Sequence, residues 1–73
     1  MSYIDTINFN VGGYMRTSGK SMADVADYLG ITPNALWMKL DGRTEFKLSE
    51  VLTLSSIIGI TPDELVGFTA ESN

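Results

Sequence analysis

Apolar residues recur along this chain at helical spacing, in five segments separated by glycine, proline and polar residues. In the first segment, Ile4, Ile7, Val11 and Tyr14 follow one another at intervals of three or four residues, which predicts a helix over Met1–Thr17. Similar stripes predict helices over residues 22–29, 33–40, 48–58 and 62–68. Because no segment shows the alternation typical of a strand, the pattern predicts an all-α fold.

A pair of adjacent glycines and a repeated tetrapeptide interrupt the helical pattern. Gly12 and Gly13 stand inside the first predicted helix, and each costs roughly 1 kcal/mol relative to alanine. We expect a neighbouring element to approach closely there, with a hinge as the alternative. The tetrapeptide GITP occurs at residues 30–33 and again at 59–62, where we interpret it as a helix stop followed by a helix start.

The stretch from Ser21 to Arg43 predicts two short helices joined by a tight turn. Ser21 is a favourable N-cap, and Gly30 stands where a left-handed C-cap favours glycine. Thr32 and Pro33 then supply the next N-cap and first helical residue. Because the connection is so short, the helices cannot lie side by side and must cross steeply, as in a helix-turn-helix.

Further features of this stretch are an alanine in the first helix, a glycine in the turn, apolar residues at Ile31, Leu36 and Leu40, and the ending L-D-G-R. With these features the chain resembles the phage Cro and repressor class of helix-turn-helix proteins. The resemblance implies one domain over residues 1–73, a five-helix lambda-repressor-like DNA-binding domain with its central motif at residues 21–43.

Composition excludes several kinds of chemistry. The chain has no cysteine and no histidine, which removes disulfides, thiolate ligands, cysteine nucleophiles and the usual general base. Its carboxylates show no spacing typical of a metal site or an acid–base pair, so we expect no enzyme and no cofactor. No apolar run reaches the length of a membrane span and no signal-peptide pattern is present, so we expect a cytoplasmic protein, in a host bacterial cell if the resemblance holds.

Charge changes the functional expectation. Five Lys and Arg face nine Asp and Glu, a net charge of −4, whereas a nucleic-acid reader usually presents a basic face. In the resembled class, the N-terminal residues of the second motif helix meet base edges. Here that helix offers Trp37 and Met38, which lie about 100° and 200° round from Leu36 and point outward. The alternative is that Trp37 packs into the core.

Three functions fit this outward face. The first is a phage antirepressor of the lysis–lysogeny switch, similar to the modulator-of-repression proteins of Gram-positive temperate phages, which would bind the DNA-binding domain of a repressor. Its expected contact residues are Met22, Pro33, Asn34, Trp37, Met38, Lys39 and Arg43.

The second function, the alternative to the first, is a Cro-like DNA-binding repressor acting on operator DNA. Its expected contact residues are Thr32, Asn34, Lys39, Arg43 and Lys47. The third is a homodimer that associates through the apolar cluster of Met22, Pro33, Trp37 and Met38.

Overall fold

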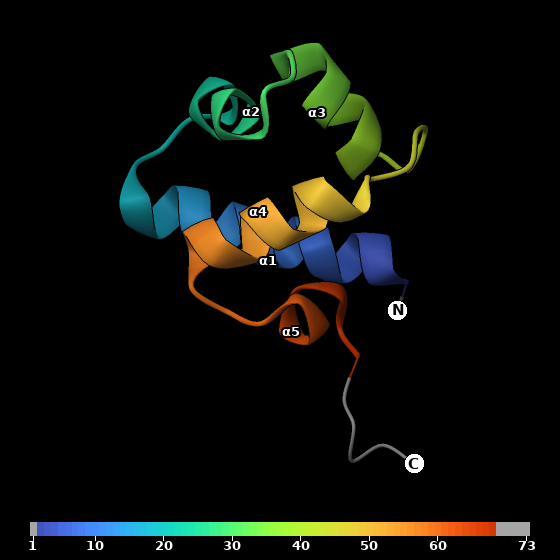
Figure 1. Cartoon of the computed structure of the whole chain (residues 1–73). Coiled ribbons are helices and arrows are strands. Elements are labelled where there is room, and N and C mark those ends of the chain that lie inside the picture. The colour runs from blue at the N-terminus through green and yellow to red at the C-terminus, as the bar shows by residue number, and fades with distance from the viewer. Residues whose placement is uncertain (1, 69–73) are drawn as a thin grey trace.

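Five α-helices make up the secondary structure over residues 2–68, the part of the chain that the computed structural model describes (Figure 1). Their bounds are α1 Tyr3–Ser18, α2 Met22–Leu29, α3 Pro33–Leu40, α4 Leu48–Ile58 and α5 Pro62–Val66. These residues include no strand, which confirms the all-α prediction. The frayed tail expected over Ala70–Asn73 lies outside the described residues.

Helices α1 and α4 form the centre of the molecule. They pack against each other, α2 and α3 cover one side, and α5 covers the other (Figure 1). Figure 1 shows α2 nearly end-on while α3 runs across the view, so these two helices cross steeply. The core between the helices consists of Ile7, Val11, Val25, Ala26, Leu36, Leu40, Leu54 and Leu65.

Local caps explain why α2 and α3 begin and end where they do. The Ser21 hydroxyl accepts from the Asp24 N–H at 3.1 Å, and the Asp24 carboxylate accepts from the Ser21 N–H at 2.9 Å. Gly30 ends α2 in the left-handed region with φ of 71°. The Thr32 hydroxyl then caps α3 by accepting from the Ala35 N–H at 3.1 Å. The predicted bounds of both helices are confirmed.

Helix α5 is shorter than predicted. It ends at Val66 instead of Phe68, because Gly67 adopts φ of 87° and leaves the helical region. The N–H groups of Gly67 and Phe68 both donate to the Asp63 carbonyl at 2.9 Å, which closes the last turn.

The glycine pair in α1 has a different environment from the one expected. A Cβ atom at Gly12 would lie 3.4 Å from Arg16 Nη1, and one at Gly13 would lie 3.7 Å from Arg16 Nη2. Among the described residues, no other element comes within 4 Å of either position, so the expected close approach was wrong. The Arg16 guanidinium, about one turn later in α1, covers the surface that the two glycines leave without side chains.

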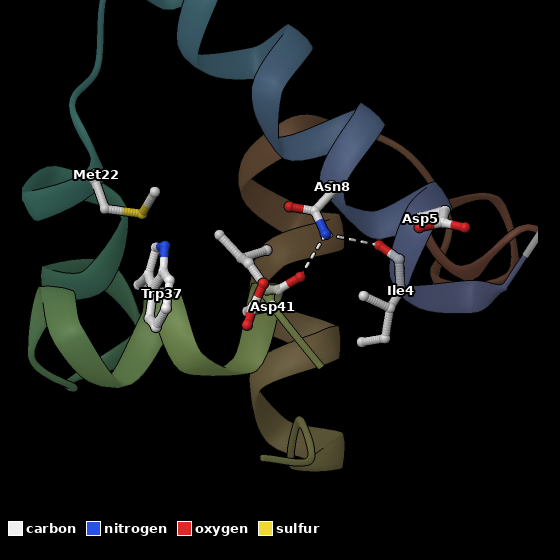
Figure 2. Close-up of a pocket in the computed structure, with 7 residues that line it drawn as sticks. Ile4, Asp5, Asn8, Met22, Trp37 and Asp41 are labelled. Atoms are coloured by element: carbon white, nitrogen blue, oxygen red, sulfur yellow. Dashed lines mark hydrogen bonds between the residues drawn. The ribbon is translucent and has the colours of Figure 1, made fainter. Parts of the chain in front are cut away.

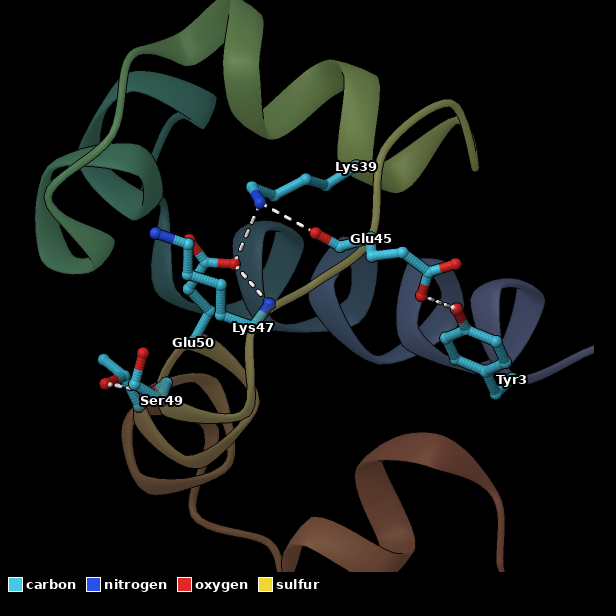
Figure 3. A network of polar contacts seen from close by, with 7 residues as sticks. Tyr3, Lys39, Glu45, Lys47, Ser49 and Glu50 are labelled. Atoms are coloured by element: carbon cyan, nitrogen blue, oxygen red, sulfur yellow. Dashed lines mark hydrogen bonds and ion pairs between the residues drawn. The ribbon is translucent and has the colours of Figure 1, made fainter.

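A buried ion pair between Lys39 and Glu50 joins α3 to α4 (Figure 3). Lys39 Nζ lies 3.1 Å from Glu50 Oε1 and donates to the Glu45 carbonyl at 2.9 Å. The same Glu50 oxygen accepts from the Lys47 N–H at 2.8 Å. Burial tends to raise the pKa of Glu50, but the hydrogen bonds from Lys47 and Lys39, together with their positive charges, outweigh it and lower that pKa below its ordinary value of 4.5.

We predict that Glu50→Gln lowers the free energy of unfolding by about 3 kcal/mol, because it leaves the Lys39 ammonium buried without a counter-charge. The double variant Lys39→Met, Glu50→Gln is the control, since it removes both charges while the glutamine oxygen still accepts from the Lys47 N–H. It should recover most of the loss. Urea unfolding followed by far-UV circular dichroism measures both; a loss below about 1 kcal/mol in the single variant would contradict the prediction.

The ion pair also predicts acid sensitivity. Because folding lowers the Glu50 pKa, its contribution to stability is present above the ordinary value of 4.5 and is lost as the pH falls through the lower folded-state value. Thermal unfolding measured from neutral pH downward should therefore show a fall in stability that begins near pH 4.5. The fall should continue until the pH is below the folded-state pKa of Glu50. Glu50→Gln should flatten this part of the profile; an unchanged slope would show that other carboxylates cause the acid sensitivity.

Candidate functional site

The outward face of α3 carries the tryptophan singled out by the sequence. Leu36 and Leu40 face the core and are 0% and 7% exposed, whereas Trp37 is 47% exposed. At 3.6 residues per turn, burying the two leucines turns the indole away from the core. The predicted outward direction of Trp37 is confirmed, and the alternative of a core tryptophan is excluded.

Arg43 lies over the indole of Trp37 and is paired with Asp41. The Arg43 guanidinium carbon lies 5.2 Å from the centre of the Trp37 ring, and its Nε donates to the Asp41 carboxylate at 2.7 Å. The ion pair is exposed and adds little to stability. It places the arginine over the ring of Trp37.

The other predicted contact residues surround Trp37 unequally. Pro33 and Asn34 are exposed in the first turn of α3. Met22 is half-buried against the core and lies beside the indole (Figure 2). Met38 is also half-buried, and its thioether accepts from the Asn34 amide at 3.8 Å. Trp37 and Pro33 therefore supply more of the open apolar surface than the methionines do.

Lys39 does not belong to this face. It appears in both predicted contact sets, yet it is 9% exposed and its ammonium is held by Glu50 and the Glu45 carbonyl. The expectation that Lys39 lies at the surface was wrong. The signal was present in the sequence, because Lys39 follows Leu36 by three residues and so shares the buried stripe.

The remaining residues of the predicted DNA contact set are Thr32 and Lys47. The Thr32 hydroxyl is engaged as the cap of α3, and Lys47 is exposed immediately before α4. With Lys39 buried and Arg43 paired with Asp41, the face offers phosphates less positive charge than the sequence suggested.

A hollow beside Trp37 was not anticipated from the sequence (Figure 2). It has a volume of about 320 Å³ and is lined by residues of α1, α2 and α3 and by the residue after α3, namely Ile4, Asp5, Asn8, Met22, Trp37, Leu40 and Asp41. The Asn8 amide donates to the Leu40 carbonyl at 2.6 Å and to the Ile4 carbonyl at 3.1 Å, which ties the end of α3 to α1. No local pattern points to these α1 residues, because the contact joins residues 32 apart in the chain.

Over residues 2–68, no group of three or more acidic, histidine or cysteine side chains is placed to hold a metal ion. No helix in that range has both the length and the apolar character needed to cross a bilayer.

Comparison of the chain with protein-family models, with curated proteins and with solved structures found no match.

We predict that Trp37→Ala and Leu36→Ala, which alter neighbouring residues of α3, differ strongly in their effect on folding. Leu36→Ala should lower the free energy of unfolding by about 3 kcal/mol, because it leaves a cavity in the core. Trp37→Ala should lower it by about 1 kcal/mol, because the indole is about half exposed. Urea unfolding compares the two; equal losses would contradict the outward placement of the indole.

Proposed function

We propose that α2 and α3 form a helix-turn-helix of the phage Cro and repressor class, and that the chain is an antirepressor. In this proposal it binds the DNA-binding domain of a phage repressor through the outward face of α3, in the cytoplasm of the host bacterium. The repressor can then no longer occupy its operator, which shifts the lysis–lysogeny switch.

The observation that carries the proposal is the exposed Trp37, which stands on the helix that reads bases in proteins of this class. Base edges are read by hydrogen-bonding side chains, above all Arg, Lys, Asn and Gln. An indole backed by Arg43 instead supplies a large, rigid apolar contact, and Trp and Arg are enriched among the residues that dominate protein–protein binding energy.

The charge of the molecule supports the same conclusion. The chain carries a net charge of −4, Lys39 is neutralised inside the fold, and Arg43 pairs with Asp41. Affinity for DNA comes largely from cations that displace counterions from phosphates. An acidic chain is better suited to the basic surface of a DNA-binding domain, where opposite charges speed association and favour the correct partner.

One observation favours a Cro-like repressor as a second candidate. Asn34 is exposed in the first turn of α3, where its amide could pair with the edge of an adenine. Arg43 and Lys47 would then contact phosphates. Under this alternative the chain itself retards operator DNA, the affinity falls steeply with salt, and replacing both cations by alanine abolishes the shift.

We predict that the chain forms a complex with the purified DNA-binding domain of the repressor encoded beside its gene, and that adding it releases that domain from operator DNA. Trp37→Ala should weaken the complex by roughly 30-fold, the effect of losing a central tryptophan anchor. Phe68→Ala is the matched control, because Phe68 is an exposed aromatic residue next to α5, on the opposite side of the α1 and α4 layer from α3. It should bind as the unmodified chain does.

Calorimetry and gel retardation measure these quantities, and three results would count against the proposal. The first is the absence of a complex, and the second is equal loss of binding in the two alanine variants. The third is retardation of the operator by the chain alone, which supports the Cro-like alternative. Sedimentation equilibrium tests the remaining hypothesis, since a homodimer formed through the apolar face would dissociate in Trp37→Ala.

A further inference from the structure

The hollow between α1 and α3 is lined by polar groups together with apolar and aromatic side chains (Figure 2). Ile4 lies on one side of it, Met22 and Trp37 lie on the other, and Leu40 contributes to the lining from the end of α3. Arg43 does not line the hollow, but its guanidinium lies over the ring of Trp37. Met22 and Leu40 can pack against an aliphatic chain, whereas the ring of Trp37 already has the Arg43 guanidinium as its cation.

Most polar groups of the hollow are hydrogen-bond acceptors, and the indole N–H of Trp37 is a donor. Asn8 uses its amide nitrogen on the Leu40 and Ile4 carbonyls, and Figure 2 shows its side-chain oxygen turned toward the Met22 side. In both Asp5 and Asp41 one carboxylate oxygen is engaged, by the Ser2 N–H at 3.4 Å and by Arg43 Nε at 2.7 Å.

For the other oxygen of each carboxylate, the described part of the chain supplies no hydrogen-bond donor. The hollow therefore offers acceptors and negative charge together with a smaller share of apolar surface. This combination matches a side chain with an aliphatic stem and a positive end.

We propose that this hollow receives an arginine or lysine side chain from the DNA-binding domain of the repressor, a refinement that rests on the proposed function. The stem would pack against Met22 and Leu40 while the cation meets the Asp41 oxygen that Arg43 leaves free. Asp5, at the opposite end of the hollow from Trp37 (Figure 2), adds negative charge without contacting the same cation. Charge complementarity selects this occupant, because a DNA-binding surface is rich in side chains that otherwise contact phosphates. A cation held here is withdrawn from DNA, so binding and blocking become the same event.

The test uses the full chain and the purified repressor domain, with Asp5→Asn, Asp41→Asn and the double variant. An asparagine at position 5 still offers an oxygen to the Ser2 N–H, so α1 keeps its cap. Asp41→Asn also weakens the hold on Arg43, which makes Asp5→Asn the cleaner single variant. Asp63→Asn is the control: it makes the same change of charge on α5, which lies on the far side of the molecule from α3 (Figure 1).

Calorimetry at low and high salt should show that the double variant binds roughly tenfold more weakly than the unmodified chain and loses part of its salt dependence. Asp63→Asn should bind within about twofold of the unmodified chain, as expected for a distant exposed charge. Thermal unfolding of every variant verifies that the fold is retained, and the two single variants decide the matter if the double variant unfolds.

The contrary outcomes separate the two proposals. If the carboxylate variants bind as the unmodified chain does while Trp37→Ala does not, the hollow is not a cation site and the proposed function stands. If Asp63→Asn loses as much affinity as the others, the attraction is general and the hollow has no special part in it. If the unmodified chain does not bind the repressor domain, the proposed function fails and this refinement fails with it.

Discussion

Burial of the stripe formed by Leu36, Lys39 and Leu40 determines what α3 presents to its surroundings. Because successive residues of a helix are 100° apart, seating this stripe against the core leaves Trp37 facing outward. The stripe contains a charge, so it needs a partner, and Glu50 of α4 supplies one (Figure 3). A rotated α3 would expose leucine and separate two buried charges, and both changes are unfavourable.

The same contact alters the electrostatic character of the surface. A lysine that could have met a phosphate is neutralised inside the fold, and the arginine beside the indole lies against Asp41. What remains around α3 is an aromatic side chain, a hollow that carries two carboxylates, and little unpaired positive charge. These properties suit a basic protein surface better than a nucleic acid, which is why the proposed partner is a DNA-binding domain and not DNA itself.

Much of the fold could be predicted from short-range patterns. The bounds of α2, α3 and α4 follow from caps and stops that act within one helical turn, such as Ser21, Thr32 and Gly59. The outward direction of Trp37 follows from periodicity. The same local rules were misjudged at two places: Gly67 ends α5 earlier than the apolar pattern implied, and Lys39 shares the buried stripe although it is charged.

By itself, then, the sequence determined where the helices lie along the chain and which side of α3 faces outward, because caps and stripes join residues no more than a few positions apart. Only the tertiary structure decided what lies around that face. The Lys39 ion pair depends on α4, the amide of Asn8 reaches Leu40 from 32 residues away, and the hollow is lined from three helices. Such contacts form only when the core brings distant segments together, so no local spacing encodes them.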